Sequence, residues 1–505
     1  MNKAIYIATS EQNSGKSIIT LGLMSMLMGK MAKVGYFRPI IEDIEEGGFD
    51  NHIETVIGHF GMDIEFEDAY AITKSKLIKK KNKGKIGEVL DLIIEKYKKL
   101  EERFDFVLVE GTGFTGEGTV IELDMNVLIA KNLGIPTIIV GSGAGKTLEE
   151  LIDSLYLLYD SFKVKDVEVL AVIANKVQLQ NIELVTNSLK KSLPQNILVN
   201  SIPLIQNLNN PTVQEIVNEL DAKVLFGAAH LNNQTGSFSV GAMQLRNYLL
   251  HLKENSLVIT PGDRADIILG ALQANESLNY PTISGIVLTG NIVPEDSILK
   301  LIEGLSTIVP IIAVEEGTYF ITNKIGSIKS KIYANNKQKI KISIATFEKY
   351  VDLDNLAEKL ITFEAEGMTP KMFQYNLVKR AREHRKHIVL PEGNDERIIR
   401  AVSRLLEMDV VAISVIGNKK QIESKVLELG LFFDFSKVQI INPIESEHFD
   451  DYVNTYYELR KAKNVTIEMA KDLMEDVSYF GTMMVYKGHA DGMVSGAAHT
   501  TQHTI

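Results

Sequence analysis

The sequence predicts an α/β protein made of three successive units. Apolar, β-branched runs alternate with helix-like stretches along most of the chain, which is typical of sheets covered by helices. The 505 residues exceed what one hydrophobic core accommodates, and at about 150 residues per domain roughly three domains are expected. A Gly- and Asn-rich stretch and a charged stretch separate the runs. We therefore expect units at residues 1–222, 223–342 and 370–505, with a connector over residues 343–369.

The first unit is predicted to be a doubly wound parallel sheet. Its strand-like runs cover residues 3–10, 34–41, 104–110, 135–141 and 169–175. The helical stretches between them cover residues 17–30, 85–100 and 147–161. Strands that alternate with helices in this way form parallel sheets with helices on both faces.

The second unit is predicted to be a small α/β fold, and the connector after it is charged with helical character. The expected strands of the second unit cover residues 256–260, 283–289 and 308–314.

The third unit begins at Pro370 and alternates again. We predict strands over residues 387–391, 410–416 and 438–442. We predict helices over residues 371–384, 395–407 and 418–429, then through residue 463 and over 466–486. Asn394 and Asn418 are placed to cap two of these helices, because Asn side chains accept hydrogen bonds from the first N–H groups.

Composition limits the classes of function. A net charge of -11 disfavours general binding to nucleic acid or anionic membranes, since both need a basic surface. The absence of cysteine excludes disulfides, thiolate nucleophiles and Cys-based zinc sites. The apolar run at residues 4–8 is a poor signal peptide, and the run at residues 21–28 is too short to span a bilayer. We expect a cytoplasmic protein without nucleic-acid or membrane partners.

A candidate phosphate-binding loop covers residues 10–17, after the first predicted strand and at the start of a helix. Backbone N–H groups at a helix start attract anions, Lys16 would reach the outer phosphates, and the Ser17 hydroxyl would hold magnesium. Ser10 replaces the usual first glycine, so the match is partial. The alternative is an inherited loop that no longer binds nucleotide.

Glu110 ends a predicted strand, where an acid can ligate magnesium opposite the loop. The alternative is an acid that makes a turn.

A run over residues 141–147 is similar to the candidate phosphate-binding loop but is one residue short of the phosphate-loop spacing. We interpret it as a turn between strand and helix, with Lys146 or Thr147 at the helix start.

Residues 3–204 resemble the dethiobiotin synthetase-like P-loop domain through the loop, residues 35–39 and 107–111, and Asn175. That family usually has lysine where Arg38 stands, which argues against dethiobiotin chemistry. The resemblance implies a site for ATP and magnesium. Its residues would be Gly15, Lys16, Ser17 and Glu110.

Residues 261–267 resemble the start of the DRTGG domain, a small regulatory module. Gly285 and residues 314–319 also fit that domain. The alternative is an Asp–Arg pair that caps a surface helix.

The third unit carries the sharpest motifs. Residues 389–393 lead from a strand into a helix that holds Arg397, Arg460 lies near a helix end, and a Gly- and hydroxyl-rich run covers residues 490–501. Glycines let a ligand approach the backbone, and hydroxyl and N–H groups bind phosphate or a polarised carbonyl. Taken singly, Arg460 is more often a solvated helix arginine, and histidines such as His499 are more often polar loop residues.

In their order along the chain, these motifs resemble the long, three-part form of the phosphate acetyltransferase family. The resemblance implies reversible acetyl transfer between acetyl-CoA and phosphate, giving acetyl phosphate and CoA. Coenzyme A is then a substrate, and no cofactor or metal is required. Transfer would be direct, with a deprotonated CoA thiol attacking acetyl phosphate while arginines bind its phosphate. The implied substrate-binding residues are Arg460, Ser495, Gly496, His499, Thr500 and Thr501.

The family pattern continues past Ile505 with a second arginine, the catalytic aspartate and the active-site serine. We therefore expect the general base beyond Ile505, a fragment or truncated product, and little or no activity of this chain. We also expect small-molecule substrates and a homo-oligomer of a size that the sequence does not give. The rival functions are a nucleotide-sensing P-loop regulatory protein and a phosphate butyryltransferase.

Overall fold

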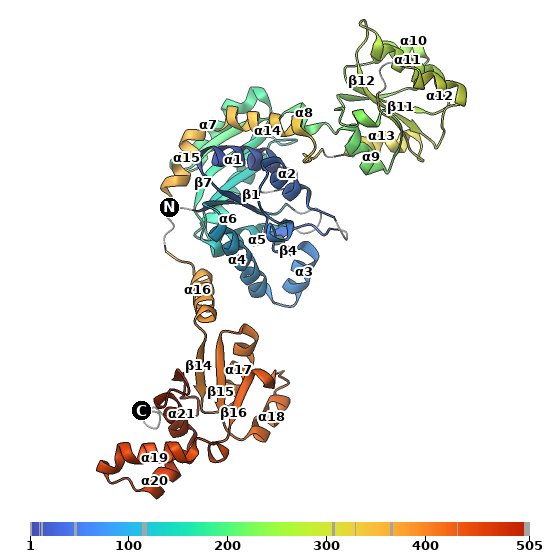
Figure 1. The fold of residues 1–505 in the computed structure, drawn as a ribbon. Coiled ribbons are helices and arrows are strands. Elements are labelled where there is room, and N and C mark those ends of the chain that lie inside the picture. The colour runs from blue at the N-terminus through green and yellow to red at the C-terminus, as the bar shows by residue number, and fades with distance from the viewer. Residues whose placement is uncertain are drawn as a thin grey trace. The chain divides into compact units, whose positions relative to one another are not determined.

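The structure is a computed structural model (Figure 1). It describes residues 3–9, 11, 14–44, 48–113, 119–305, 309–328, 330–363, 367–431 and 433–498. The chain divides into two compact units, Met1–Thr369 and Pro370–Ile505. The first unit contains two main sheets and the second unit contains one. The domain boundaries predicted within the first unit stay predictions.

The first sheet is parallel and has the strand order β2-β5-β1-β6-β7-β8. Its strands are β1 (Ala4–Thr9), β2 (Val34–Phe37), β5 (Phe106–Glu110), β6 (Thr137–Ser142), β7 (Val169–Val177) and β8 (Leu198–Pro203). The predicted strand over residues 34–41 is wrong as a single element. Pro39 has no N–H for the ladder, and the chain resumes as β3 (Ile40–Ile41), which pairs with β4 (Ile72–Thr73).

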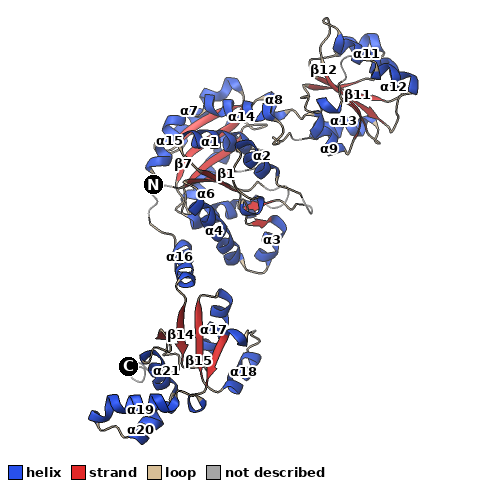
Figure 2. Cartoon of the chain, in the orientation of Figure 1, coloured by secondary structure: helices blue, strands red, loops and turns tan. Residues whose placement is uncertain are grey.

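Helices cover the first sheet (Figure 2). They are α1 (Lys16–Lys30), α2 (Asn51–Phe60), α3 (Lys74–Asn82), α4 (Ile86–Arg103), α5 (Thr119–Leu133), α6 (Leu148–Lys163), α7 (Ile182–Ser192) and α8 (Gln206–Asn209). Two later helices also pack here: α14 (Lys337–Tyr350) contacts α1, and α15 (Leu353–Thr362) contacts β7. Much of the predicted connector is therefore part of the layer that covers the first sheet.

The second sheet has the order β10-β11-β12-β13-β9, and only β9 runs antiparallel to its neighbour among these described strands. The strands are β9 (Lys223–Phe226), β10 (Ser237–Val240), β11 (Ser256–Pro261), β12 (Ile283–Thr289) and β13 (Ile311–Ala313). Its helices are α9 (Val213–Leu220), α10 (Leu245–Tyr248), α11 (Ala265–Glu276), α12 (Asp296–Glu303) and α13 (Thr318–Ser327). Two apolar clusters form its core, and α9 contributes Val213, Ile216 and Leu220 to one of them.

The second compact unit, Pro370–Ile505, corresponds to the third unit predicted from the sequence. It is built on a parallel sheet with the order β16-β15-β14-β17. Its strands are β14 (Lys386–Leu390), β15 (Val411–Ile416), β16 (Val438–Ile441) and β17 (Gly492–Met493). Its helices are α16 (Pro370–Glu383), α17 (Glu396–Met408), α18 (Lys419–Glu428), α19 (Phe449–Arg460), α20 (Ile467–Glu475) and α21 (Val477–Tyr486).

Two predicted details of the second unit are wrong. The cap of α17 is Asp395 rather than Asn394, since the Asp395 carboxylate accepts from the N–H of Arg397 at 2.8 Å. The single helix predicted over residues 466–486 breaks at Asp476, whose carboxylate caps α21 by accepting from Ser478 N. The predicted cap of α18, Asn418, is confirmed.

In the part of the chain that the structure describes, no helix combines the length and apolarity that a bilayer crossing requires.

Candidate functional site

The described part of the predicted phosphate-binding loop, residues 11 and 14–17, lies between β1 and the first turn of α1, as expected, and residues 10, 12 and 13 fall outside the described residues. Gly15 precedes the helix with a φ of 81°, a conformation that favours glycine. Asn175 at the end of β7 fixes this turn, because its Nδ2 donates to the carbonyl oxygen of Ser14 at 2.7 Å. A Cβ on Gly15 would lie 2.2 Å from that Nδ2. The turn therefore requires glycine at this position on two independent grounds.

Lys16 is the first residue of α1 and is 7% exposed. Its Nζ donates to the carbonyl oxygen of Gly111 at 2.6 Å, which draws the amino group toward the end of β5. Ser17 follows on the same helix turn and is partly exposed at the pocket. The structure thus brings Gly15, Lys16 and Ser17 to one place, as the sequence predicts.

Glu110 is fully buried at the end of β5. Its Oε2 accepts from the hydroxyls of Thr20 at 2.7 Å and Tyr36 at 3.0 Å. Its Oε1 lies 3.0 Å from Nδ1 of His52 and 3.8 Å from Nη1 of Arg38.

Burial alone would raise the pKa of Glu110. His52, Arg38 and Lys16 outweigh that effect and hold the pKa of the carboxyl well below its ordinary value. Burial likewise raises the pKa of Tyr36 well above its ordinary value, and the Glu110 charge adds to it. Glu110 is therefore an ionised carboxylate whose charge is already compensated by neighbouring side chains.

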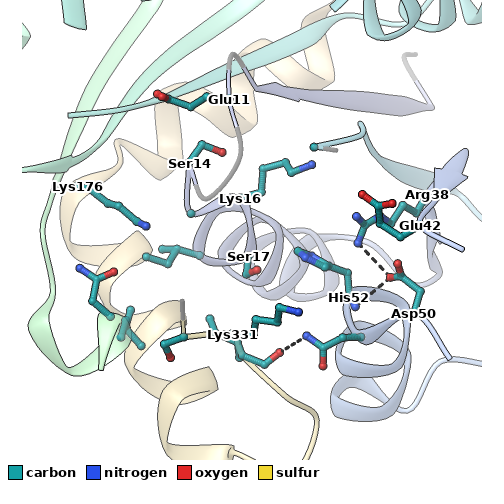
Figure 3. Close-up of a pocket in the computed structure, with 18 of the residues that line it drawn as sticks. Glu11, Ser14, Lys16, Ser17, Arg38, Glu42, Asp50, His52, Lys176 and Lys331 are labelled. Carbon is teal, nitrogen blue, oxygen red and sulfur yellow. Dashed lines mark hydrogen bonds and ion pairs between the residues drawn. The ribbon is translucent and has the colours of Figure 1, made fainter. Parts of the chain in front are cut away.

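A cavity of about 390 Å³ opens beside the loop (Figure 3). Gly15, Lys16 and Ser17 line it, and Glu110 does not. Two further lysines line it that the sequence did not single out, Lys176 at the end of β7 and Lys331 before α14. Lys176 follows the predicted Asn175, so its strand-end position was a usable signal. Lys331 lies far along the chain and carries no local motif.

The residues present do not fit the predicted magnesium ion. Ser17 could offer a hydroxyl, but the Glu110 carboxylate is occupied by two hydroxyls and faces His52 and Arg38. Among the described residues there is also no group of three acidic or histidine side chains arranged to hold a metal. Glu110 serves the structure here by joining α1, β2 and α2.

Residues 141–147, whose sequence is similar to the phosphate-binding loop, form a turn that leads into α6. The Thr147 hydroxyl accepts from Glu150 N at 3.2 Å, and the Glu150 carboxylate accepts from Thr147 N at 2.8 Å. This reciprocal capping box agrees with the structural interpretation. Lys146 pairs with Glu11 at 2.6 Å.

In the second unit, the loop after β17 is bound to the turn between β14 and α17. The Glu392 carboxylate, 5% exposed, accepts from the N–H groups of Gly496 at 3.0 Å, Ala497 at 2.8 Å and Ala498 at 2.7 Å. Arg397 also donates to the carbonyl oxygen of Ala497. Glu392 lies in the motif at residues 389–393, but no local pattern there indicates this contact.

The predicted substrate-binding residues of the second unit are placed only in part. Ser495 and Gly496 lie in the loop that Glu392 holds, and the Ser495 Oγ is buried and has no hydrogen-bond partner among the described residues. Arg460 is exposed at the end of α19, and within the described ranges no hydrogen bond joins its guanidinium to that loop. The prediction for His499, Thr500 and Thr501 falls outside the described residues.

These features define a P-loop α/β unit followed by an α/β unit with a loop whose backbone is held by Glu392. Three family models match the chain. They are an AAA domain over residues 3–226, a DRTGG domain over residues 215–328 and a phosphate acetyl/butaryl transferase over residues 372–505.

Curated relatives match the whole chain, and two of them are described here. Phosphate acetyltransferases from Nitratidesulfovibrio vulgaris and Synechocystis sp. are 40% and 39% identical to it, and the alignments cover 100% of this chain and 72% and 73% of those proteins. A solved phosphotransacetylase from Streptococcus pyogenes is 38% identical over 27% of this chain and 41% of its own, with a TM-score of 0.25. The chain belongs to the phosphate acetyltransferase family, whose members are acyltransferases that exchange acetyl between acetyl-CoA and phosphate.

Proposed function

We propose that the unit Pro370–Ile505 binds the phosphate-bearing substrates of acetyl exchange at its loop and at Arg460. The observation that supports this most is the Ser495 Oγ, a buried hydroxyl in a loop whose backbone is fixed, for which the described part of the chain offers no hydrogen-bond partner. A buried hydroxyl without a hydrogen bond costs free energy, so a ligand group is the natural partner. The other residues proposed for this site are Gly496, His499, Thr500 and Thr501.

The proposed roles follow from the chemistry of the groups. An arginine holds a phosphate through two parallel N–H bonds, and a hydroxyl polarises the carbonyl that the thiolate attacks. In the direction of acetyl-CoA formation the C–S bond forms, the C–O bond to phosphate breaks, and phosphate leaves with the bonding electrons. No residue of this chain is proposed as the base that takes the thiol proton.

Equilibrium binding of acetyl phosphate and of CoA to the 505-residue chain tests this proposal. Arg460→Ala should weaken acetyl phosphate binding roughly ten- to hundred-fold, the value of a charge-assisted hydrogen-bonded contact. Arg404→Ala is the matched control, since Arg404 is an exposed helix arginine of the same unit. Equal affinities for the two variants would remove Arg460 from the site. The assay of acetyl-CoA formation from acetyl phosphate and CoA then measures turnover directly.

A second function is supported by the cavity beside Gly15, Lys16 and Ser17. We propose that it binds the phosphates of a nucleotide such as ATP, since it combines a helix start, a buried lysine and a hydroxyl. Titration with a fluorescent ATP analogue tests it. Lys16→Ala should abolish most of the binding, and Lys30→Ala at the other end of α1 should not. Unchanged affinity in Lys16→Ala would contradict the proposal.

We also propose a homo-oligomer located in the cytoplasm. Membership of the family supports the oligomeric state and the location. Light scattering coupled to gel filtration measures the mass of the chain in solution, and a monomer at all concentrations would contradict the proposed homo-oligomer. Acetyl is proposed over butyryl as the transferred group, because the relatives that align with the whole of this chain are named phosphate acetyltransferases.

A further inference from the structure

We propose that a second cavity, at the edge of the second sheet, binds an uncharged nucleobase or nucleoside. This cavity measures about 500 Å³, which lies within the roughly 300–1,000 Å³ of small-molecule sites. It opens where the parallel strands β10, β11 and β12 begin, beside Gly236, Asn255 and Ile283. The site is separate from the cavity beside the phosphate-binding loop, and it does not depend on the nucleotide function proposed there.

The lining of the second cavity is dense in carboxamides. Eight of its fifteen residues are asparagine or glutamine, and three more carry hydroxyls. Among the described residues of this lining none is an aspartate, glutamate, lysine or arginine, and the exposed His230 is the one side chain that titrates near neutral pH. Such a lining has no fixed charge to pair with a phosphate or a carboxylate. Its ligand is therefore uncharged and is recognised through hydrogen bonds.

Ser284 on β12 gives the most direct indication of a ligand. It is 2% exposed, it lines the cavity, and its Oγ forms no hydrogen bond with any described residue. The other two hydroxyls of the lining are already bound. Thr235 Oγ1 donates to the carbonyl oxygen of Pro211 at 2.7 Å, and Thr282 Oγ1 donates to the Glu254 carboxylate. A buried hydroxyl normally has a partner, so Ser284 presents an unused donor and acceptor to the cavity.

Gln234 supplies a second unused group, a donor. Its Nε2 is buried, and the described part of the chain offers that nitrogen no acceptor. The backbone of Gln234 is held by an antiparallel bridge to Thr212. Asn255, also on the lining, is held by its own N–H, which donates to the carbonyl oxygen of Thr282 at 2.8 Å. The frame around the unused groups is therefore fixed before a ligand arrives, and binding orders little backbone.

Two further amides use one end of the side chain on the protein. Asn233 Nδ2 donates to the carbonyl oxygen of Ser284 at 3.2 Å, and Asn275 Oδ1 accepts from the N–H of Ile283 at 2.9 Å. The other ends, an acceptor and a donor, are available to a ligand. A nucleobase presents donors and acceptors along one edge, and Asn and Gln side chains pair with such edges. Ile283 and Val309 add apolar contact for a flat ring.

Calorimetric titration of the 505-residue chain with adenosine, guanosine, cytidine and uridine tests the proposal. We expect at least one of the four nucleosides to bind. Ser284→Ala and Gln234→Leu should each weaken that binding roughly three- to ten-fold, as loss of one hydrogen bond does. Neither substitution should lower the midpoint of urea unfolding, because each removes a polar group that the folded protein leaves without a partner among its described residues. A purely structural role would instead lower the midpoint.

Ser297→Ala on α12 and Gln273→Leu on α11 are the matched controls, because both side chains are exposed and neither lines the cavity. Lys16→Ala should keep the nucleoside affinity, and its loss there would move the nucleoside to the first cavity and overturn this site. Binding of none of the four nucleosides, or binding that Ser284→Ala and Gln234→Leu leave unchanged, would also overturn it. Binding of glucose or sucrose without any nucleoside would overturn the assignment to nucleobases.

Discussion

The Glu392 carboxylate accepts a hydrogen bond of 2.7 Å from the backbone N–H of Ala498, a residue more than a hundred positions further along the chain. The N–H groups of Gly496 and Ala497 point to the same carboxylate. Successive N–H groups of this kind form a concave site that favours an anion. In this protein an internal anion already fills it. The backbone of the loop is therefore fixed by the protein, and substrate contacts are left to side chains such as Ser495.

Glu392→Gln should loosen this loop without unfolding the second unit. An amide presents only one acceptor oxygen and lacks the negative charge, so the opening free energy of the loop should fall by about 1–3 kcal/mol. Hydrogen exchange at Gly496, Ala497 and Ala498 should then become roughly ten- to hundred-fold faster. Amide exchange followed by mass spectrometry or NMR measures it.

Glu396→Gln is the control for that experiment, because Glu396 pairs with Arg400 on the exposed face of α17. Exchange at the loop should stay unchanged in this variant. Equal protection of the loop in wild type and Glu392→Gln would show that the carboxylate does not fix it.

The crossing of α1 and α14 depends on a glycine. A Cβ on Gly22 would lie 2.1 Å from the ring of Phe347, which is fully buried. Gly22→Ala should therefore destabilise the first unit by about 1–3 kcal/mol despite the better helix propensity of alanine. Gly29→Ala in the same helix meets no atom within 4 Å and should stabilise the unit by about 0.5–1 kcal/mol. Urea unfolding of both variants measures the difference, and effects of the same sign would contradict the packing argument.

Local patterns predicted most of the strands and the phosphate-binding loop. The apolar run that became β12 and the Gly15–Ser17 turn depend on neighbouring residues only, so periodicity and turn chemistry were sufficient. The cap of α17 was predicted one residue early, because Asn394 and Asp395 can both cap a helix. The break at Pro39 was missed, because the apolar run over residues 34–41 was interpreted as one strand.

Contacts between distant segments could not be predicted. Lys331 reaches the cavity only because Glu215 and Asn51 hold the segment before α14, and no spacing in one sequence encodes that. The same applies to Glu392, whose partners are separated from it by 104 to 106 positions. For Glu110 the position at a strand end was predicted. The side chains that face its carboxylate, His52 and Arg38, come from α2 and from the turn between β2 and β3.

A buried ion pair links α14 to α9. Lys339 Nζ lies 2.8 Å from Glu215 Oε2, with side-chain exposures of 2% and 5%. Burial lowers the pKa of Lys339, and the Glu215 charge opposes that shift. Lys339→Met should destabilise the first unit by about 3–5 kcal/mol, since it leaves a buried carboxylate without its cation.

The double variant Lys339→Met, Glu215→Gln should recover part of that loss, because no buried charge then remains. Lys341→Met on the exposed face of α14 is the control. Thermal unfolding of wild type, Lys339→Met, Glu215→Gln and the double variant completes a double-mutant cycle. Additive effects of the two substitutions would show that the pair is not coupled.

The compensated charge of Glu110 predicts how the first unit responds to acid. Its pKa is held well below the ordinary value of 4.5, despite burial, by His52, Arg38 and Lys16. The unfolded chain therefore takes up this proton at a higher pH than the folded chain. The stabilisation is fully present above about pH 4.5 and is lost as the pH falls toward the lowered folded pKa. Glu110→Gln should be less stable at neutral pH and should lose less stability on acidification. Urea unfolding across this pH range, compared with the exposed control Glu358→Gln on α15, measures the slope, and parallel pH profiles of wild type and Glu110→Gln would refute the linkage.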